Sequence, residues 1–127
     1  MSGKVVHFEV PFDDGARARS FYKEIFDWQL QTMPEMGGYT LVVSGPSGDQ
    51  GPTEPGFING GMLSRDQGAT SGPVIVVDVD DIDATLAKIG ELGGSTVTAK
   101  VPVGDMGFAA YFTDPEGNVV GLWETAR

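Results

Sequence analysis

An internal repeat constrains the fold of this chain more than any other feature. A strand-like segment followed by a pair of aspartates and an amphipathic helix occurs twice. Asp13 and Asp14 precede the first helix, and Asp80 and Asp81 precede the second, so the offset is 67 residues (80 − 13). Aspartate before a helical pattern is a typical N-cap. Self-similarity at a fixed spacing indicates one supersecondary unit that is built twice.

The pattern between these landmarks predicts an α+β fold of two βαβββ modules. Apolar stripes at helical spacing follow each aspartate pair, Ala18, Phe21, Tyr22, Ile25 and Phe26 in the first helix and Ile82, Leu86, Ile89 and Leu92 in the second. Strands are expected at 5–10, 28–33, 39–43, 57–63, 74–79, 96–101, 108–113 and 119–124. Each helix should cover the outer face of its own sheet, which leaves the other faces as paired half-barrels around a cup.

Length and composition limit the classes of protein that this chain can belong to. A length of 127 residues suits one domain, with module one at about 4–64 and module two at about 73–125. Eight basic against eighteen acidic residues give a net charge of −10, which argues against nucleic acid and anionic membranes as partners. The chain has no cysteine, no leader-like start and no apolar run of about 20 residues, so we expect a cytoplasmic protein without a membrane span.

Glycine and proline mark the irregular segments. The stretch from Ser44 to Gly56 is rich in both and is expected to be the least ordered internal segment, with a lid as one role. Gly60 and Gly61 interrupt a strand, which indicates a close approach of another backbone segment or a bulge beside the cavity. The segment 114–118 reads as a tight turn between the last two strands.

His7 is the first candidate for a ligand site. Val6, Phe8 and Val10 alternate with His7 and Glu9 along the first strand, so the two polar side chains share the face opposite the apolar stripe. His7 is the only histidine, which rules out a two-histidine metal site within one chain. The simplest interpretation is a hydrogen-bonded polar anchor in a pocket, and an acid–base role is the alternative.

Three segments resemble the vicinal oxygen chelate superfamily, which includes glyoxalase I, extradiol dioxygenases and bleomycin resistance proteins. They are VHFEV at 6–10, ARSFYKEIFDW at 18–28 and FTDPEGNVVGLWE at 112–124. The resemblance spans the whole chain and is closest to small bacterial glyoxalase-like proteins. It implies a small-molecule ligand, a homodimer and, in the metal-dependent members, ligands from the first and last strand of each module.

Carried over by position, the resemblance gives an incomplete metal site. His7 matches the first-strand ligand and Glu124 the last-strand ligand, whereas Val74 takes the third position and has no donor atom. The fourth position falls in 57–63, where Asn59 is the only polar side chain. Glu9 is a possible third ligand, but two residues along a strand span about 7 Å. Catalytic zinc usually has three protein ligands, so a divalent metal is not expected as a resident cofactor.

These arguments predict a ligand pocket and leave its function open. The predicted pocket residues are His7, Glu9, Asn59, Val74, Tyr111 and Glu124, with His7 and Glu124 as the candidate metal ligands. Two or three of Trp28, Trp123, Tyr39, Tyr111, Phe108, Met62 and Met106 are expected to line it as well. The first hypothesis is a metal-independent small-molecule-binding protein. The alternatives are a glyoxalase-type lyase or isomerase that uses metal on His7 and Glu124, and an accessory module with a vestigial cup.

Overall fold

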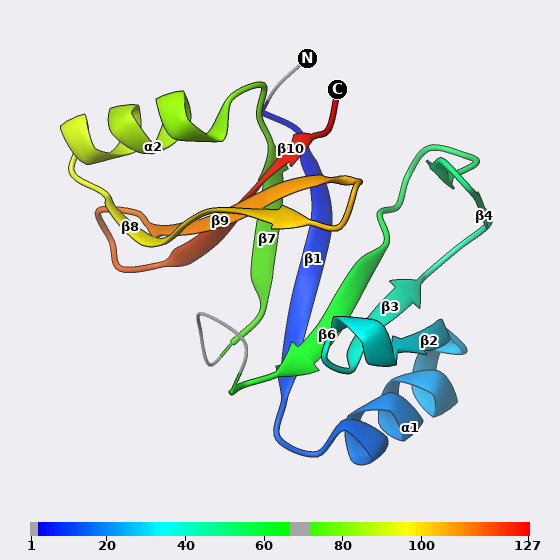
Figure 1. Ribbon diagram of the computed structural model, residues 1–127. Helices are drawn as coiled ribbons and strands as arrows, with labels where there is room; N and C mark the ends of the chain where they lie inside the picture. Colours follow the sequence, from blue (N-terminus) through cyan, green and yellow to red (C-terminus); the bar gives the residue numbers. More distant parts are fainter. Residues whose placement is uncertain (1–2, 67–71) are drawn as a thin grey trace. The chain divides into compact units, whose positions relative to one another are not determined.

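The computed structural model describes residues 3–66 and 72–127. Figure 1 shows its elements in chain order: β1 (Val5–Phe12), α1 (Gly15–Phe26), β2 (Gln29–Met33), η1 (Pro34–Met36), β3 (Tyr39–Val43), β4 (Ser47–Gly48), β5 (Gly51–Pro52), β6 (Gly60–Ser64), β7 (Val74–Asp78), α2 (Ile82–Glu91), β8 (Ser95–Val103), β9 (Gly107–Thr113) and β10 (Val119–Thr125). The chain forms two compact units. The first unit is His7–Pro73, and the second unit is Met1–Val6 with Val74–Arg127.

The first unit is one βαβββ module. Its sheet has the order β2-β3-β6-β1, in which β1 runs parallel to β6 and the other neighbours are antiparallel. Asp14 begins α1, because its side chain accepts a hydrogen bond from the Arg17 backbone N–H at 3.0 Å. Asp27 ends the helix in the left-handed conformation, with φ at 57°.

The second unit repeats this topology. Its sheet has the order β7-β10-β9-β8, with β10 parallel to β7 and antiparallel to β9. Asp81 begins α2 by accepting from the Ala84 backbone N–H at 3.0 Å, and it lies 67 residues after Asp14 (81 − 14). The predicted α+β class and the two βαβββ modules are therefore confirmed.

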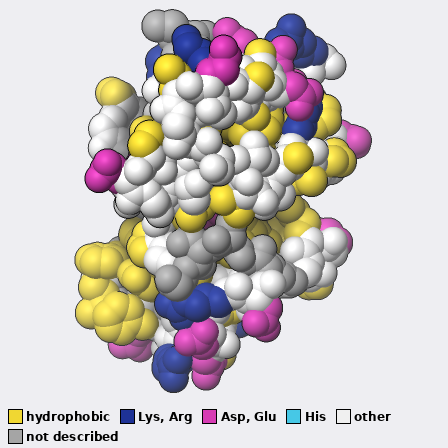
Figure 2. Space-filling model, turned by 90° about the vertical axis from the view of Figure 1, so that its left-hand side faces the viewer, with side chains coloured by type: hydrophobic (Ala, Val, Ile, Leu, Met, Phe, Trp, Pro, Cys, Tyr) yellow, Lys and Arg dark blue, Asp and Glu magenta, His cyan; other side chains and the backbone are white. Residues whose placement is uncertain are grey.

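The two helices differ in how they meet their sheets. In the second unit, Ile82 of α2 packs with Ala110 and Leu122 in a buried core. In the first unit, α1 has no buried residue, and three apolar side chains of its predicted stripe, Phe21, Ile25 and Phe26, are each 57% exposed. Figure 2 shows one face of the molecule, where hydrophobic side chains gather in groups between acidic and basic ones.

The segment from Ser44 to Gly56 has a defined structure. It contains the small β4–β5 hairpin, and Thr53 closes it with hydrogen bonds from its N–H and its hydroxyl to the Pro46 carbonyl. The following strand starts at Gly60 instead of 57, because Ile58 and Asn59 accept hydrogen bonds from Ser44. The predicted mobility of this segment stays a prediction. No helix in the described ranges is long and apolar enough to cross a membrane.

Candidate functional site

Strand alternation in β1 separates an aromatic face from a polar face. On one face, the Phe8 ring lies 5.8 Å from Trp28, which stacks on Tyr22 of α1 with 5.2 Å between ring centroids. His7 and Glu9 therefore lie on the face of β1 opposite α1. Glu9 is 8% exposed.

Tyr39 joins the two polar side chains of β1. It lies at the start of β3, and its hydroxyl is 2.8 Å from His7 Nε2 and 3.3 Å from Glu9 Oε2. The hydroxyl has one hydrogen, which it donates to the Glu9 carboxylate. Its oxygen then accepts from His7 Nε2–H. The result is a chain of hydrogen bonds from His7 through Tyr39 to Glu9.

Gly61 explains how Tyr39 reaches β1. Strand β6 lies between β3 and β1, and Gly61 is the direct partner of Glu9 in the parallel β1–β6 pair. A Cβ atom at Gly61 would overlap the Tyr39 hydroxyl and ring. The predicted close backbone approach is found at Gly60, where the nearest atom is the Phe8 carbonyl oxygen, whereas at Gly61 the approaching group is the Tyr39 side chain.

Burial sets the protonation state of His7. Removal of the imidazole from water disfavours its charged form and lowers the pKa of His7 from 6.5 to about 4. His7 is therefore neutral at pH 7. With hydrogen on Nε2, its Nδ1 atom is a hydrogen-bond acceptor and a potential base.

The second unit carries an apolar version of this arrangement. Val74 and Val76 occupy the positions 67 residues after His7 and Glu9, and they are 4% and 6% exposed. Gly121 pairs with Val76, and a Cβ atom there would lie 3.3 Å from the Tyr111 ring. Each unit thus places a tyrosine over a glycine beside its first strand, and the two valines of the second unit stand where the first unit has His7 and Glu9.

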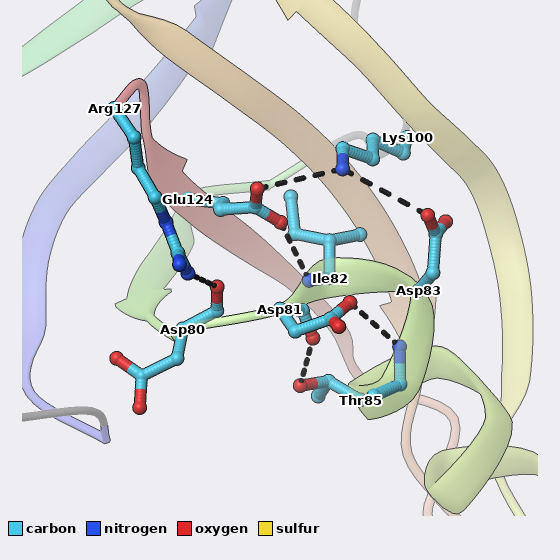
Figure 3. A network of polar contacts seen from close by, with 9 residues as sticks. Asp80, Asp81, Ile82, Asp83, Thr85, Lys100, Glu124 and Arg127 are labelled. Carbon is cyan, nitrogen blue, oxygen red and sulfur yellow. Dashed lines mark hydrogen bonds and ion pairs between the residues drawn. The ribbon is translucent and has the colours of Figure 1, made fainter.

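Glu124 has a structural role at the start of α2. Its Oε1 accepts a hydrogen bond from the Ile82 backbone N–H at 2.8 Å, and its Oε2 lies 3.4 Å from Lys100 Nζ. Figure 3 shows these contacts, together with the ion pair between Lys100 and Asp83 at 3.8 Å. Glu124 alternates with Leu122, whose side chain packs against α2, so both lie on the helix-covered face of β10. The predicted metal-ligand role of Glu124 finds no support in these contacts.

An open hollow of about 620 Å³ adjoins Glu124 in the second unit. It is lined by Asp78, Val79, Asp80, Glu124, Thr125, Ala126 and Arg127. Arg127 donates a hydrogen bond to the Asp80 carbonyl at 3.0 Å across this end of the unit. The hollow combines Glu124 with the end of β7 and the C-terminal residues, which is a different set from the predicted pocket.

Asn59 holds the preceding loop. Its Oδ1 accepts from the Ser44 backbone N–H at 2.9 Å, and its Nδ2 donates to the Ser47 hydroxyl at 2.8 Å. Both ends of the amide are thus used within the segment around the β4–β5 hairpin. The role of Asn59 as a pocket residue stays a prediction, and the contacts assign it to the loop.

The residues present do not fit the divalent metal that the sequence resemblance implies. Within 3–66 and 72–127, no group of three or more His, Cys, Asp or Glu side chains converges on one point. The Tyr39 hydroxyl already lies between His7 and Glu9, and Glu124 serves α2.

Tyr39 is the site residue that the sequence reasoning did not single out. It was one of seven candidates for the pocket wall, with nothing to rank it above the others. Its contact with β1 crosses an intervening strand, so it depends on the sheet order. The glycine at position 61 is the one local signal, because it indicates that a bulky group lies over that strand.

Two kinds of sequence relative resemble this chain. A family model described as bleomycin resistance protein-like N-terminal matches residues 4–45, which contain His7, Glu9 and Tyr39. "Putative glyoxylase CFP32" of Mycobacterium bovis is 31% identical over 121 residues, which are 90% of this chain and 42% of that protein. The chain therefore spans less than half the length of that relative. "Probable lactoylglutathione lyase" of Vibrio parahaemolyticus is 30% identical over 125 residues, which are 95% of this chain and 90% of that protein.

A solved structure extends the similarity to the fold. Methylmalonyl-CoA epimerase from Mycobacterium tuberculosis superposes with a TM-score of 0.61 at 15% identity, over 96% of this chain and 87% of that one. At this identity the match supports the fold alone. Together with the near full-length lyase relative and the duplicated βαβββ topology, it leads to one assignment. The chain belongs to the vicinal oxygen chelate superfamily, the superfamily of glyoxalases and bleomycin resistance proteins.

Proposed function

We propose that this chain binds a small molecule on the sheet face of the first unit that carries His7, Glu9 and Tyr39, and that it does so without a resident metal. The observation that carries the proposal is the hydrogen-bonded chain from His7 Nε2 through the Tyr39 hydroxyl to Glu9 Oε2. A few fixed polar groups on a largely apolar surface are typical of small-molecule sites, because they orient the ligand. The ligand itself is unidentified.

The chemistry of these groups defines what the ligand must offer. Neutral His7 presents Nδ1 as an acceptor, so a ligand hydroxyl or amide N–H suits it. Tyr39 can turn its hydroxyl toward a ligand oxygen in exchange for its bond to Glu9. Both contacts are neutral hydrogen bonds, which contribute about 0.5–1.5 kcal/mol each.

The relatives suggest three probes for a binding experiment. They are bleomycin, lactoylglutathione and methylmalonyl-CoA, measured by calorimetry in the presence of a metal chelator. Tyr39→Phe should weaken the binding of any probe that binds by about 5- to 10-fold, as expected for one neutral hydrogen bond. Tyr22→Phe is the matched control, because Tyr22 lies on α1 at the opposite face. Equal effects of the two variants, or no binding of any probe at about 1 mM, would contradict the proposal.

A second candidate function is proton transfer, as in a lyase or isomerase. It is favoured by the neutral imidazole of His7, which is joined to an acid through Tyr39. Lactoylglutathione incubated with the protein in D₂O tests this function, with and without added divalent metal. Deuterium incorporation next to the thioester that disappears in His7→Gln would support catalysis. Incorporation at the rate of the protein-free control would leave binding as the function.

The proposal includes a homodimer. Phe21, Ile25 and Phe26 give α1 an exposed apolar surface, and such surfaces commonly mark association sites. A second copy is the partner proposed here, because the mycobacterial relative is more than twice as long as this chain. Light scattering at tens of micromolar should give twice the mass of 13.4 kDa. A monomer mass at that concentration would argue against a dimer.

A further inference from the structure

The position of Tyr39 relative to β1 requires a residue without a side chain in the intervening strand. Adjacent strands lie about 4.8 Å apart, so β3 and β1 are separated by about 10 Å across β6. The Tyr39 side chain spans this distance by lying flat over β6. Its ring passes over Gly61, the residue in register with Glu9. A side chain at position 61 would occupy the same space as the Tyr39 ring.

Gly61 leaves less room for a side chain than Gly121, the glycine under a tyrosine in the second unit. At Gly121 in the second unit, a Cβ atom would lie 3.0 Å from Val76 and 3.3 Å from Tyr111, which small shifts of flexible side chains can relieve. At Gly61, the three nearest atoms all belong to Tyr39, and the added atom would overlap them. The comparison isolates one specific requirement at Gly61, which is space for the Tyr39 ring.

The Tyr39 hydroxyl contacts the donor atoms of both His7 and Glu9, which a metal ion bound by these two residues would also contact. A divalent ion bound by His7 and Glu9 would lie about 2.0–2.2 Å from each donor atom, between them. The Tyr39 oxygen lies 2.8 Å from His7 Nε2 and 3.3 Å from Glu9 Oε2. It binds both side chains at once, because it accepts from the imidazole and donates to one oxygen of the carboxylate. An ion bound to both donor atoms would compete with these two hydrogen bonds.

We propose that the Gly61–Tyr39 pair replaces a metal ion in this site. Gly61 leaves the surface of β6 free of a side chain, and the Tyr39 hydroxyl excludes divalent cations from His7 and Glu9. The same hydroxyl is the group that contacts the ligand. Gly61 is thus a positioning residue that acts through Tyr39. The role toward the ligand rests on the proposed function. The exclusion of metal and the requirement for glycine do not, because they follow from the contacts within the first unit.

Zinc titration of the wild type and of Tyr39→Ala tests the exclusion of metal. The chain has one histidine, so its ring protons report on the site in an NMR spectrum without interference. Zn²⁺ should perturb these signals in Tyr39→Ala at a concentration at least about tenfold lower than in the wild type, because the Tyr39 hydroxyl no longer competes for His7 and Glu9. Tyr22→Ala is the control on the opposite face and should behave as the wild type. Equal zinc affinity of wild type and Tyr39→Ala would overturn the proposal.

A double-mutant cycle tests the requirement for glycine. Gly61→Ala should lower the urea midpoint of the wild type, but in Tyr39→Ala it should leave the midpoint unchanged or raise it, since alanine is preferred over glycine in a strand. Gly121→Ala serves as the comparison and should lower the midpoint less. If Gly61→Ala alone is too unstable to purify, the urea midpoint of the Gly61→Ala/Tyr39→Ala double variant is compared with that of Tyr39→Ala. An unchanged or raised midpoint in the double variant supports the role of Gly61. A midpoint lowered equally in both backgrounds would refute the role of Gly61.

These results separate the two proposals. If Tyr39→Ala binds zinc more tightly than the wild type, and the stability effects of Gly61→Ala and Tyr39→Ala are coupled, the metal replacement is supported. If no probe binds in the same protein, the proposed function is rejected. If a probe binds and its binding depends on Tyr39, while zinc affinity is unchanged and the two substitutions act independently, the proposed function is supported and the metal replacement is rejected.

Discussion

Replacing His7 with glutamine should remove a defined part of the acid sensitivity of folding. Burial lowers the pKa of His7 from 6.5 to about 4 in the folded protein. Between these values the unfolded chain binds the proton more readily, so stability rises with pH in this window. The contribution of neutral His7 is fully present above about pH 6.5 and is lost as the pH falls to about 4. At about 1.4 kcal/mol for each pH unit, the loss amounts to roughly 3 kcal/mol.

Urea unfolding of wild type and His7→Gln at about pH 7.5, 6, 5 and 4 measures this contribution. The eighteen carboxylates also titrate on acidification, but they are common to both proteins. The difference between the two stability curves therefore reports on His7. Glutamine is neutral throughout, and its amide can still donate to the Tyr39 hydroxyl. Parallel curves over this range, or an imidazole that titrates near 6.5 in the NMR spectrum, would refute the reasoning.

Three further substitutions test individual contacts. Asp81→Ala removes the acceptor of the Ala84 N–H and should lower the free energy of unfolding by about 1 kcal/mol in urea; no change would show that the cap is not needed. Glu124→Ala removes the acceptor of the Ile82 N–H and should cost about 1–3 kcal/mol by the same assay, whereas an unchanged midpoint would point to a role outside folding. Asn59→Ala should speed proteolysis within 44–56, and a cleavage pattern equal to wild type would contradict its role in holding that loop.

The repeat made the topology predictable. Asp14 and Asp81 each start a helix, and the alternation before them gives the first strand of each module, because capping and strand periodicity are local properties. The same alternation placed His7 and Glu9 on one face. The burial of α1 was not predictable, because its stripe shows which side chains are apolar but not how closely the helix meets its sheet.

Three parts of the site depend on contacts that the sequence does not encode locally. Tyr39 contacts β1 across β6, the strand that lies between β3 and β1. This contact depends on the order of the strands in the sheet, which is a long-range property. Glu124 was expected in the pocket, but both faces of β10 are apolar, so alternation alone left its direction open. Asn59 was expected there as well, although its amide is used by a loop whose path no periodicity describes.

The protonation pattern of the single imidazole tests the central claim most directly. A long-range ¹H–¹⁵N spectrum at neutral pH distinguishes hydrogen on Nε2 from hydrogen on Nδ1. The account predicts neutral His7 with hydrogen on Nε2, bonded to the Tyr39 oxygen, and no change of these signals after one equivalent of Zn²⁺. Hydrogen on Nδ1, or ring signals that shift to saturation at one equivalent of Zn²⁺, would contradict a site built on a tyrosine hydroxyl.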